Sequence, residues 1–384
     1  MIVGVDYTAA AWQGAGIGRL TRELIRSVVE LDRSITYRLF FAAGGLPKNS
    51  PYLHDLRQMC EQFPHVCAFP LPFSPRVLTI IWQRLRLRLL VEHLVGRIDV
   101  VHAPDFVLPP TRAHTILTVH DLTFLRHPEC FEPSLQHYLV EVVPRSLDRA
   151  DTILADSQAT AVDLTSFLGI HPQRIQVIYP GVSEQFRPLP AEQTEAVRKR
   201  LGLPNYFLLF VGTLEPRKNL VRLLEAYHCL LNEASLSPLP DLVIAGRRGW
   251  LYEGIFDAVD RLGLRSRVLF LDFVADGDLP ALYNLARVFV YPSLYEGFGL
   301  PVIEAMACGT AVVTANVASL PEAAGEAAIL VNPENIGSIM DGILEALTQS
   351  EHLASIGKDH VCRFNWGTSA QRLLTCYRQV AGYG

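Results

Sequence analysis

Two carboxylates, Glu296 and Glu304, occur in a stretch that is otherwise apolar and rich in glycine. Gly297 and Gly299 lie between them and allow the backbone to approach a ligand closely, because glycine carries no side chain beyond hydrogen. Ionised carboxylates accept strong hydrogen bonds from hydroxyl groups. These residue types in this spacing predict a pocket for a ligand that carries many hydroxyl groups.

The residues around the two carboxylates predict a strand, a loop and a short helix. Apolar runs at 288–291 and 311–313 are typical of buried strands. Pro301 suits the start of a helix and Gly309 suits a left-handed helix end. Free N–H groups at such a helix start bind phosphate, so the stretch predicts a nucleotide site. The alternative is that Glu304, expected in the first helical turn, only complements the helix dipole, while the loop carboxylate is solvated.

Two adjacent cations, Arg217 and Lys218, follow a predicted strand at 206–211 and precede a predicted helix that begins near Leu220. Cations beside helix N–H groups can hold a diphosphate and stabilise it as it leaves. The alternative is a pair of solvated surface charges.

The first half opens with a predicted strand at 2–5, a turn that contains Gly14, Gly16 and Gly18, and an amphipathic helix through 20–31. In doubly wound folds, a glycine-rich turn after the first strand is where phosphates or a second domain meet the sheet. A dinucleotide-binding interpretation lacks an acidic residue at the end of the second strand. A tight turn that binds nothing is the other alternative.

A histidine, His120, directly follows the predicted strand at 115–119 and is expected to project beyond the carboxyl end of the sheet. The alternative is a packed histidine that is satisfied by Asp121. His102 and Asp105 follow another predicted strand in the same way and are candidates for lining an acceptor site.

Strands and helices alternate along the whole chain, which predicts parallel sheets with helices on both faces. A length of 384 residues exceeds one ordinary core, so we expect two domains, with the turn-rich segment 179–190 between them. Further strands are predicted near residues 37–40, 66–69, 100–101, 152–155, 175–178, 242–245, 268–271 and 328–331.

Composition excludes several classes of protein. A net charge of −5 argues against general nucleic-acid binding, and no apolar run reaches membrane-spanning length. Seven cysteines without C-x2-C spacing favour a reducing compartment and argue against a structural zinc site. The N-terminal residues predict a strand and not a signal peptide, so we expect a cytoplasmic location. Asp276 and Asp278 have D-x-D spacing, but Asp278 precedes a predicted helix and is explained as its N-cap.

A basic and apolar run covers residues 76–88, where Arg84, Arg86 and Arg88 alternate with leucines after Trp82. If the run is helical, it has the features of an interfacial helix on anionic lipid. The alternative is an ordinary helix of the domain with a solvated basic face.

The spacing from Glu296 to Glu304 resembles the E-x7-E signature of retaining glycosyltransferases of the GT-B fold, family 4 (glycosyl transferases group 1). The sequence of residues 292–310 around the two carboxylates resembles the same family. The resemblance implies an α/β protein with two Rossmann-like, doubly wound domains that face a deep interdomain cleft. Residues 1–180 would form the acceptor domain and 181–365 the nucleotide-sugar donor domain, while 366–384 would be a helix crossing back to the first domain.

The resemblance also implies roles for residues of this chain. Lys218 and Arg217 would bind the leaving phosphates, and Glu296 would hold sugar hydroxyls beside His120. The family often has arginine directly after the glycine of this turn, but Thr213 stands there, which leaves the role of Arg217 open. The residues implied to line the donor site are Gly16, Gly18, Thr213, Phe273 and Val274 (the last two at the base), Phe298, Gly299 and Leu300, and Glu304 at the ribose.

The segment 212–218 is most similar to mannosyltransferases that use GDP-mannose, so we expect a hexosyltransferase of polysaccharide biosynthesis with a GDP- or UDP-sugar donor. The resemblance implies a glycan or lipid-linked acceptor, no metal or other cofactor, and front-face transfer. We expect a cytoplasmic protein that contacts the inner membrane face peripherally through 76–90. The alternatives are a sugar-nucleotide epimerase, a phosphorylase, or a non-catalytic nucleotide-sugar binding module.

Overall fold

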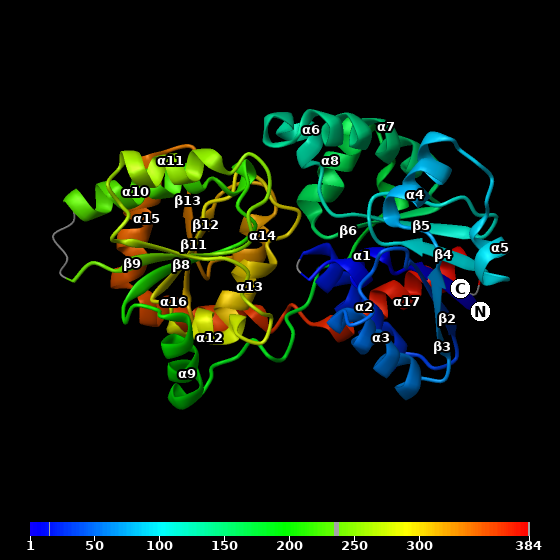
Figure 1. Ribbon diagram of the computed structural model, residues 1–384, viewed down its shortest axis with the longest axis horizontal. Coiled ribbons are helices and arrows are strands. Elements are labelled where there is room, and N and C mark those ends of the chain that lie inside the picture. Colours follow the sequence, from blue (N-terminus) through cyan, green and yellow to red (C-terminus); the bar gives the residue numbers. More distant parts are fainter. Residues whose placement is uncertain (15, 234–237, 383–384) are drawn as a thin grey trace. The chain divides into compact units, whose positions relative to one another are not determined.

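The computed structural model describes residues 1–14, 16–233 and 238–382, and the chain forms two units (Figure 1). The first unit comprises residues Met1–Leu122, His137–Gly181 and Asn365–Gly384 as far as they are described. The second unit comprises Thr123–Gln136 and Val182–Phe364. Each unit is built on one parallel sheet.

The sheet of the first unit has seven strands in the order β3-β2-β1-β4-β5-β6-β7, and every pairing is parallel. Its strands are β1 (Ile2–Asp6), β2 (Thr36–Ala42), β3 (Val66–Leu71), β4 (Val100–Ala103), β5 (His114–Val119), β6 (Thr152–Ala155) and β7 (Ile175–Val177). The helices are α1 (Thr8–Trp12), α2 (Ile17–Leu31), α3 (Pro51–Gln62), α4 (Pro75–Thr79), α5 (Val91–Val95), α7 (Pro133–Arg149), α8 (Gln158–Leu168) and α17 (Trp366–Val380).

The sheet of the second unit has six parallel strands in the order β10-β9-β8-β11-β12-β13. Its strands are β8 (Phe207–Val211), β9 (Asp241–Ala245), β10 (Val268–Leu271), β11 (Val288–Tyr291), β12 (Ala311–Ala315) and β13 (Ile329–Val331). The helices are α6 (Thr123–Arg126), α9 (Ala191–Leu201), α10 (Leu220–Glu233), α11 (Glu253–Arg261), α12 (Leu279–Leu285), α13 (Leu300–Ala307), α14 (Leu320–Ala324), α15 (Ile336–Thr348) and α16 (Ser350–Val361).

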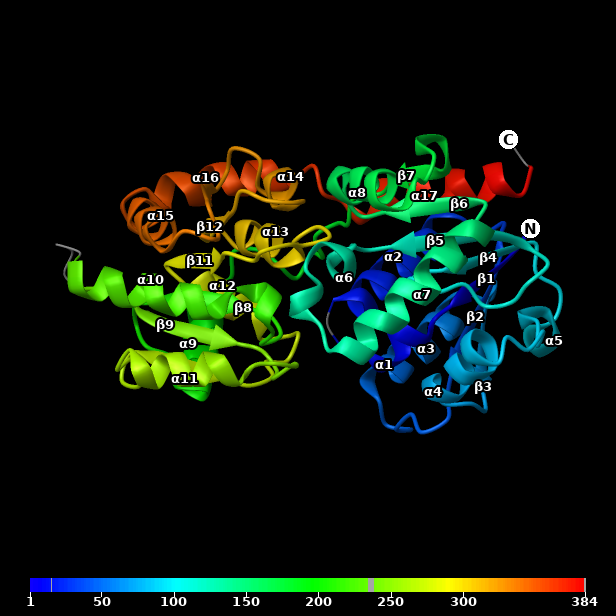
Figure 2. The same cartoon turned by 90° about the horizontal axis from the view of Figure 1, so that it is seen from above.

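The strands form where the sequence is continuously apolar, as a parallel sheet covered on both faces requires. Residues Phe207–Phe210 of β8 and all of β12 are buried. In the second unit, α10 and α11 lie on one face of the sheet and α9 and α12 on the other (Figures 1 and 2). The predicted strands are therefore confirmed, and the α/β class with them.

Strand order identifies one switch point in each sheet. In the first sheet the order reverses between β1 and β4, and in the second it reverses between β8 and β11. In open parallel sheets, ligands bind beyond the carboxyl ends of the strands at such a point. The two cations follow β8 and the loop with Glu296 follows β11. The glycine-rich turn does not directly follow β1 as predicted, because the short helix α1 lies between them.

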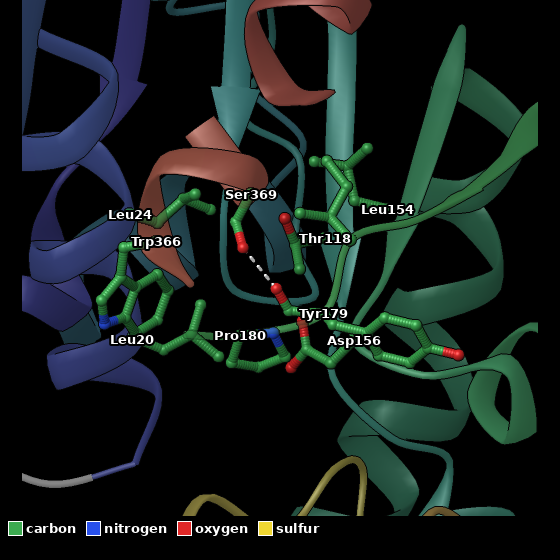
Figure 3. A pocket seen from close by; sticks show the side chains of 10 residues that line it. Leu20, Leu24, Thr118, Leu154, Asp156, Tyr179, Pro180, Trp366 and Ser369 are labelled. Atoms are coloured by element: carbon green, nitrogen blue, oxygen red, sulfur yellow. Dashed lines mark hydrogen bonds between the residues drawn. The ribbon is translucent and has the colours of Figure 1, made fainter. Parts of the chain in front are cut away.

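The last helix, α17, belongs to the first unit and packs beside α2. The hydroxyl of Tyr377 on α17 lies 2.8 Å from Nδ1 of His102 on β4, and both residues are fully buried. At the start of α17, Ser369 donates to the carbonyl of Tyr179 at 2.5 Å, beside a small pocket that Trp366 helps to line (Figure 3). Polar anchors thus hold α17 at both ends.

We expect Tyr377→Phe to lower the free energy of unfolding by about 1–3 kcal/mol, because the buried His102 nitrogen loses its partner. Urea unfolding measures this change. Tyr206→Phe is the control, since the Tyr206 hydroxyl has no hydrogen bond among the described residues. Equal stability of the two variants would contradict the anchoring role of Tyr377.

Residues Thr123–Gln136 belong to the second unit, although the predicted boundary placed everything before 181 in the first domain. Side-chain contacts explain the difference. Trp250 donates from Nε1 to the carbonyl of Cys130 at 2.6 Å, and its ring lies 5.8 Å from that of Phe131. An aromatic side chain far along the sequence therefore holds this segment.

The run 76–88 is not one amphipathic helix. It consists of α4, a single π-helical turn at Ile80–Arg84, and an irregular segment in which Arg86 has a φ of 52°. Trp82 is 8% exposed, donates to the carbonyl of Leu89 and packs in a core cluster with Phe40. Burial of this large ring anchors the turn and prevents a continuous helix. Among the described residues, no helix combines the length and the apolar character needed to cross a bilayer.

Candidate functional site

Helix α13 begins at Leu300, directly after the loop that carries Glu296. Gly299 caps it with a φ of 104°, a left-handed conformation that glycine adopts at little cost. The helix ends at Ala307, and Gly309 follows with a φ of 78°, as predicted. Because the helix starts at Leu300, Glu304 lies in its second turn and not in the first as expected.

The side chain of Glu304 is 3% exposed, so it is not a surface residue that complements the helix dipole. Tyr283 of α12 donates from its hydroxyl to Oε2 of Glu304 at 3.2 Å. The carboxylate therefore has a fixed position inside the second unit.

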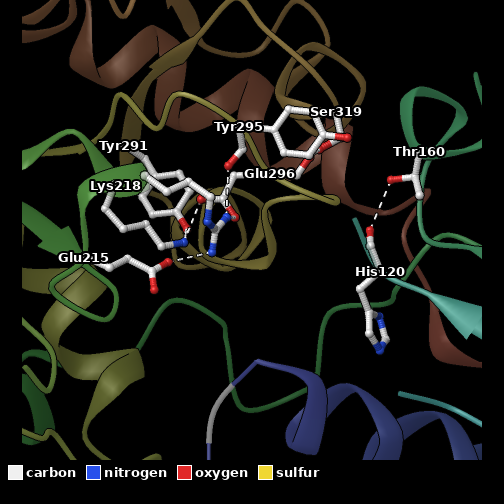
Figure 4. A network of polar contacts seen from close by, with 9 residues as sticks. His120, Thr160, Glu215, Lys218, Tyr291, Tyr295, Glu296 and Ser319 are labelled. Atoms are coloured by element: carbon white, nitrogen blue, oxygen red, sulfur yellow. Dashed lines mark hydrogen bonds and ion pairs between the residues drawn. The ribbon is translucent and has the colours of Figure 1, made fainter. Parts of the chain in front are cut away.

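Glu296 is the centre of a buried network of charges (Figure 4). Its side chain is 9% exposed, Oε1 lies 2.6 Å from Nζ of Lys218, and Oε2 lies 2.7 Å from Nη1 of Arg217. Burial alone would raise the pKa of Glu296, but the two cations outweigh it and lower the pKa to about 2. Ser319 donates to the carbonyl of Glu296 at 2.7 Å and fixes the backbone of the loop. The solvated-loop alternative is therefore wrong.

Both predicted cations are also largely buried, with side-chain exposures of 16% for Arg217 and 8% for Lys218. Lys218 donates to the hydroxyl of Tyr291 at 2.6 Å, and Arg217 donates to the carbonyl of Tyr295 at 2.9 Å. Burial lowers the pKa of Lys218, and the charge of Arg217 lowers it further, against the opposing effect of Glu296. The alternative of two solvated surface charges is wrong.

The tight turn before α10 positions these cations. Pro216–Lys218 form one 3-10 turn, and Asn219 follows in the left-handed region with a φ of 60°. The Asn219 amide donates to the carbonyls of Pro292 and Pro333 at 3.0 and 2.7 Å, so the turn is tied to the end of β11.

Glu215 is a member of the network that sequence reasoning missed. It is 4% exposed, and its Oε1 accepts from Nη2 of Arg217 at 2.7 Å. Together with Glu296 it balances the two cations. The only available signal was an acid two residues before Arg217, which is too common a pattern to indicate burial.

The other predicted donor residues lie at neighbouring strand ends of the second unit. Thr213 is exposed after β8, and after β10 Phe273 is 47% exposed while Val274 is 8% exposed. Phe298 is 4% exposed and packs edge-on against Phe364, with 5.2 Å between ring centroids. The ring of Phe298 is therefore packed inside the second unit.

In the first unit, Gly16 caps α2 with a φ of 55°, and a Cβ on Gly18 would lie 2.3 Å from the carbonyl oxygen of Gln13. Ala15 lies outside the described residues. Arg22, which sequence reasoning missed, is 9% exposed and donates to the carbonyls of Ala10, Gln13 and Gly14. Its guanidinium also lies 4.3 Å from the ring centre of Tyr52, so the glycine-rich turn has a buried cation beneath it.

The side chain of His120 is packed, not projecting freely from the strand end. It is 5% exposed, Nδ1 lies 2.7 Å from Oδ2 of Asp156, and Nε2 lies 2.7 Å from the carbonyl of Pro104. Burial would lower the pKa of His120, but Asp156 and Asp105 raise it to about 9. The ring therefore carries a proton on each nitrogen at neutral pH, and its carboxylate partner is Asp156 and not Asp121. Figure 4 shows the carbonyl of His120, which accepts from Thr160.

His102 does not line an open site, because it is fully buried between Tyr377 and Thr118. Burial lowers its pKa to about 3, which keeps it neutral. Asp105 is partly exposed, and burial raises its pKa to about 6.

Asp278 of the D-x-D pair occupies the N-cap position of α12, as predicted, but its side chain does not cap the helix. It accepts a hydrogen bond from Arg200 of α9 at 2.6 Å instead. Among the described residues, no three or more His, Cys, Asp or Glu side chains are grouped to hold a metal ion.

Two family profiles match the sequence. The profile of Glycosyl transferases group 1 matches residues 193–360, and that of Glycosyltransferase Family 4 matches residues 14–186. The O-antigen chain mannosyltransferase B of Escherichia coli is 33% identical over 283 residues, which cover 73% of this chain and 74% of the relative. The serotype-specific mannosyltransferase WbdA of Escherichia coli is 34% identical over 276 residues, but this chain spans only about a third of its length. The D-inositol 3-phosphate glycosyltransferase of Gordonia bronchialis is 31% identical over 281 residues, which cover 70% of this chain and 60% of the relative.

Solved structures share the fold. Sucrose-phosphate synthase from Thermosynechococcus elongatus superposes with a TM-score of 0.76 at 20% identity, covering 100% of this chain and 99% of that one. Anabaena HepE, solved with UDP and glucose, superposes with a TM-score of 0.72 at 20% identity, and the match covers 98% of this chain and 99% of HepE. The two sheet-based units and the charged network at a switch point agree with these matches. The chain therefore belongs to the group 1 glycosyl transferases and has the GT-B fold.

Proposed function

We propose that this glycosyltransferase is a retaining hexosyltransferase that moves mannose from GDP-mannose to a glycan or lipid-linked glycan acceptor. The observation that carries the proposal is the buried network of Arg217, Lys218 and Glu296 at the β8/β11 switch point. The names of the Escherichia coli relatives, O-antigen and serotype-specific mannosyltransferases, support mannose. HepE was solved in complex with UDP-glucose, so the base and the sugar need a direct test.

The cations serve the departure of the diphosphate. When the bond between the sugar and the β-phosphate breaks, negative charge grows on the phosphate oxygens and the sugar becomes an oxocarbenium-like cation. Lys218 and Arg217, held by Tyr291 and Tyr295, stabilise that charge. The amides of Gly299 and Leu300 at the start of α13 supply further donors. In this proposal protein cations supply the charge, so we expect chelation with EDTA to leave turnover unchanged.

The carboxylates hold hydroxyl groups and do not attack the sugar. Glu296 accepts hydrogen bonds from the sugar hydroxyls and Glu304 from the ribose. In front-face transfer, the acceptor hydroxyl forms the new bond on the side from which the diphosphate leaves, and the leaving phosphate takes the acceptor proton. The sugar keeps its anomeric configuration without a covalent enzyme intermediate.

Turnover tests the proposal directly. The purified chain is incubated with GDP-mannose or UDP-glucose, with and without short mannose-containing glycans, and released nucleoside diphosphate is measured. Release of GDP only in the presence of acceptor, with an α-linked product by NMR, supports retaining transfer. Interconversion of the donor sugar without acceptor would instead indicate an epimerase, and consumption of inorganic phosphate a phosphorylase. Binding of donor without turnover of any acceptor would indicate a binding module.

Peripheral membrane contact is part of the proposal and rests on the irregular segment after the π-helical turn. Leu85 and Leu87 are 61% and 52% exposed, and they alternate with the exposed cations Arg84, Arg86 and Arg88. Exposed leucines can insert at a lipid surface, and arginines are attracted to anionic headgroups.

We expect the chain to float with phosphatidylglycerol vesicles at low salt, and the double variant Leu85→Ser, Leu87→Ser to stay in solution. Vesicles of phosphatidylcholine and the variant Leu251→Ser, which alters an exposed leucine of the second unit, are the controls. Failure of the unaltered chain to bind anionic vesicles would remove membrane contact from the proposal.

A further inference from the structure

The loops that follow β8, β9 and β10 form one fixed platform. The amide of Leu214 donates to the carbonyl of Arg247 at 2.9 Å, and the amide of Gly249 donates to the carbonyl of Leu214 at 2.9 Å. A Cβ on Gly246 would lie 1.9 Å from the carbonyl oxygen of Gly212, so the two backbones touch where only glycine fits. Gly246 also donates to the carbonyl of Leu271 at the end of β10. These contacts set where Arg247 lies relative to the cations after β8.

The side chain of Arg247 is exposed and has no hydrogen bond or ion pair among the described residues. Its guanidinium lies 4.1 Å from the ring centre of Phe273, which is itself 47% exposed. Stacking on a ring favours one orientation of the guanidinium plane, so less rotamer entropy is lost when its N–H groups bind a ligand. A planar pair of donors is therefore held ready at the edge of the platform.

The position suits the base of a nucleotide. Strand β9 neighbours β8, and β10 is the next strand along, with adjacent strands about 4.8 Å apart. A nucleotide whose diphosphate lies on Arg217 and Lys218 after β8 reaches the ends of β9 and β10 with its base, on the side away from β11. Arg247 and Phe273 are an exposed arginine and an exposed aromatic residue at those ends.

We propose that Arg247, stacked on Phe273, reads the O6 and N7 acceptors of a guanine base and makes the enzyme selective for GDP-sugars. The inference rests on the proposed donor site. Arginine donates in parallel to O6 and N7 of guanine, whereas adenine presents a donor at the same place and uracil lacks the pair of acceptors. Neighbouring Arg248 lies over Phe256 and Tyr252 instead and is not part of this pair.

Calorimetric titration with GDP, IDP, ADP and UDP tests the inference. We expect GDP and IDP, which share O6 and N7, to bind more tightly than ADP and UDP. We expect Arg247→Ala to lower the affinity for GDP and IDP by roughly 10- to 100-fold and to leave the affinity for UDP nearly unchanged. Arg247→Lys keeps the charge but loses the fork of donors, so the preference for GDP falls while the affinity for all four diphosphates stays measurable. Arg248→Ala is the matched control and keeps the full preference.

Three results would overturn the inference, and they separate it from the proposed function. If the unaltered chain binds UDP or ADP best, guanine recognition is wrong while the donor site stands. If Arg247→Ala lowers the affinity for all four diphosphates equally, the Arg247 side chain binds phosphate and not the base. If no nucleoside diphosphate binds the folded chain, the proposed function fails together with the inference.

Discussion

Lys218→Met lowers the turnover number for sugar transfer by about 10²- to 10³-fold, the usual cost of losing one fixed donor at a developing negative charge. Lys218 is 7% exposed and already fixed by Tyr291 and Glu296. Methionine is unbranched like lysine and one atom shorter, and it lacks the charge and the N–H donors. Steady-state release of nucleoside diphosphate in the presence of acceptor measures the loss.

The same substitution leaves the buried Glu296 with one cation fewer, and breaking a buried pair costs about 3–5 kcal/mol of stability. Activity is therefore measured at a temperature at which circular dichroism shows the variant to be folded. Lys199→Met, which alters a 73%-exposed lysine of α9, is the matched control and keeps both activity and stability. Turnover of folded Lys218→Met within threefold of the unaltered chain would exclude Lys218 from the phosphate site.

Glu296→Gln separates nucleotide binding from sugar transfer. In the free enzyme the Glu296 carboxylate occupies Arg217 and Lys218, the two groups that the diphosphate needs. Glutamine has the same shape without the charge, so GDP no longer competes with a carboxylate for the two cations. We expect GDP to bind roughly tenfold more tightly. This change corresponds to a modest fraction of the interaction energy between two close charges near a protein surface. Transfer falls by about 100-fold or more, because the variant loses a charged acceptor for the sugar hydroxyls in the transition state.

Calorimetry with GDP and turnover with the full donor test the two parts of this result. Glu195→Gln, which alters an exposed ion pair with Arg198, changes neither quantity. Weaker binding of GDP to Glu296→Gln with normal turnover would contradict the assigned role, since it would place the carboxylate with the nucleotide and not with the sugar.

The sequence was sufficient for the framework of the site because the features that build it are local. Continuous apolar runs mark strands whose two faces are covered, and glycine marks positions with positive φ, such as Gly309. Arg217, Lys218 and Glu296 could be singled out because each follows a predicted strand and precedes a predicted helix. That they pair with one another depends on side-chain directions in three dimensions, which spacing does not contain.

The errors have the same origin. Trp82 and His102 occur in patterns typical of an interfacial helix and an open strand end, but both enter the interior because distant residues offer packing or a hydrogen bond. Arg22 and Glu215 were missed because their partners are backbone carbonyls and a neighbouring cation, which leave no periodicity in the sequence. Only the tertiary structure decides between burial and exposure at such positions.

The placement of α17 has a consequence for synthesis of the protein. The first unit contains residues 1–122 and 137–181 but also α17, so its fold is completed only after residues 366–380 have been synthesised. Until then the face of α2 that α17 covers has no partner, and His102 lacks the hydroxyl of Tyr377. All residues of the second unit are therefore synthesised before the first unit is complete, and a premature stop before residue 365 leaves that face of α2 without its partner helix.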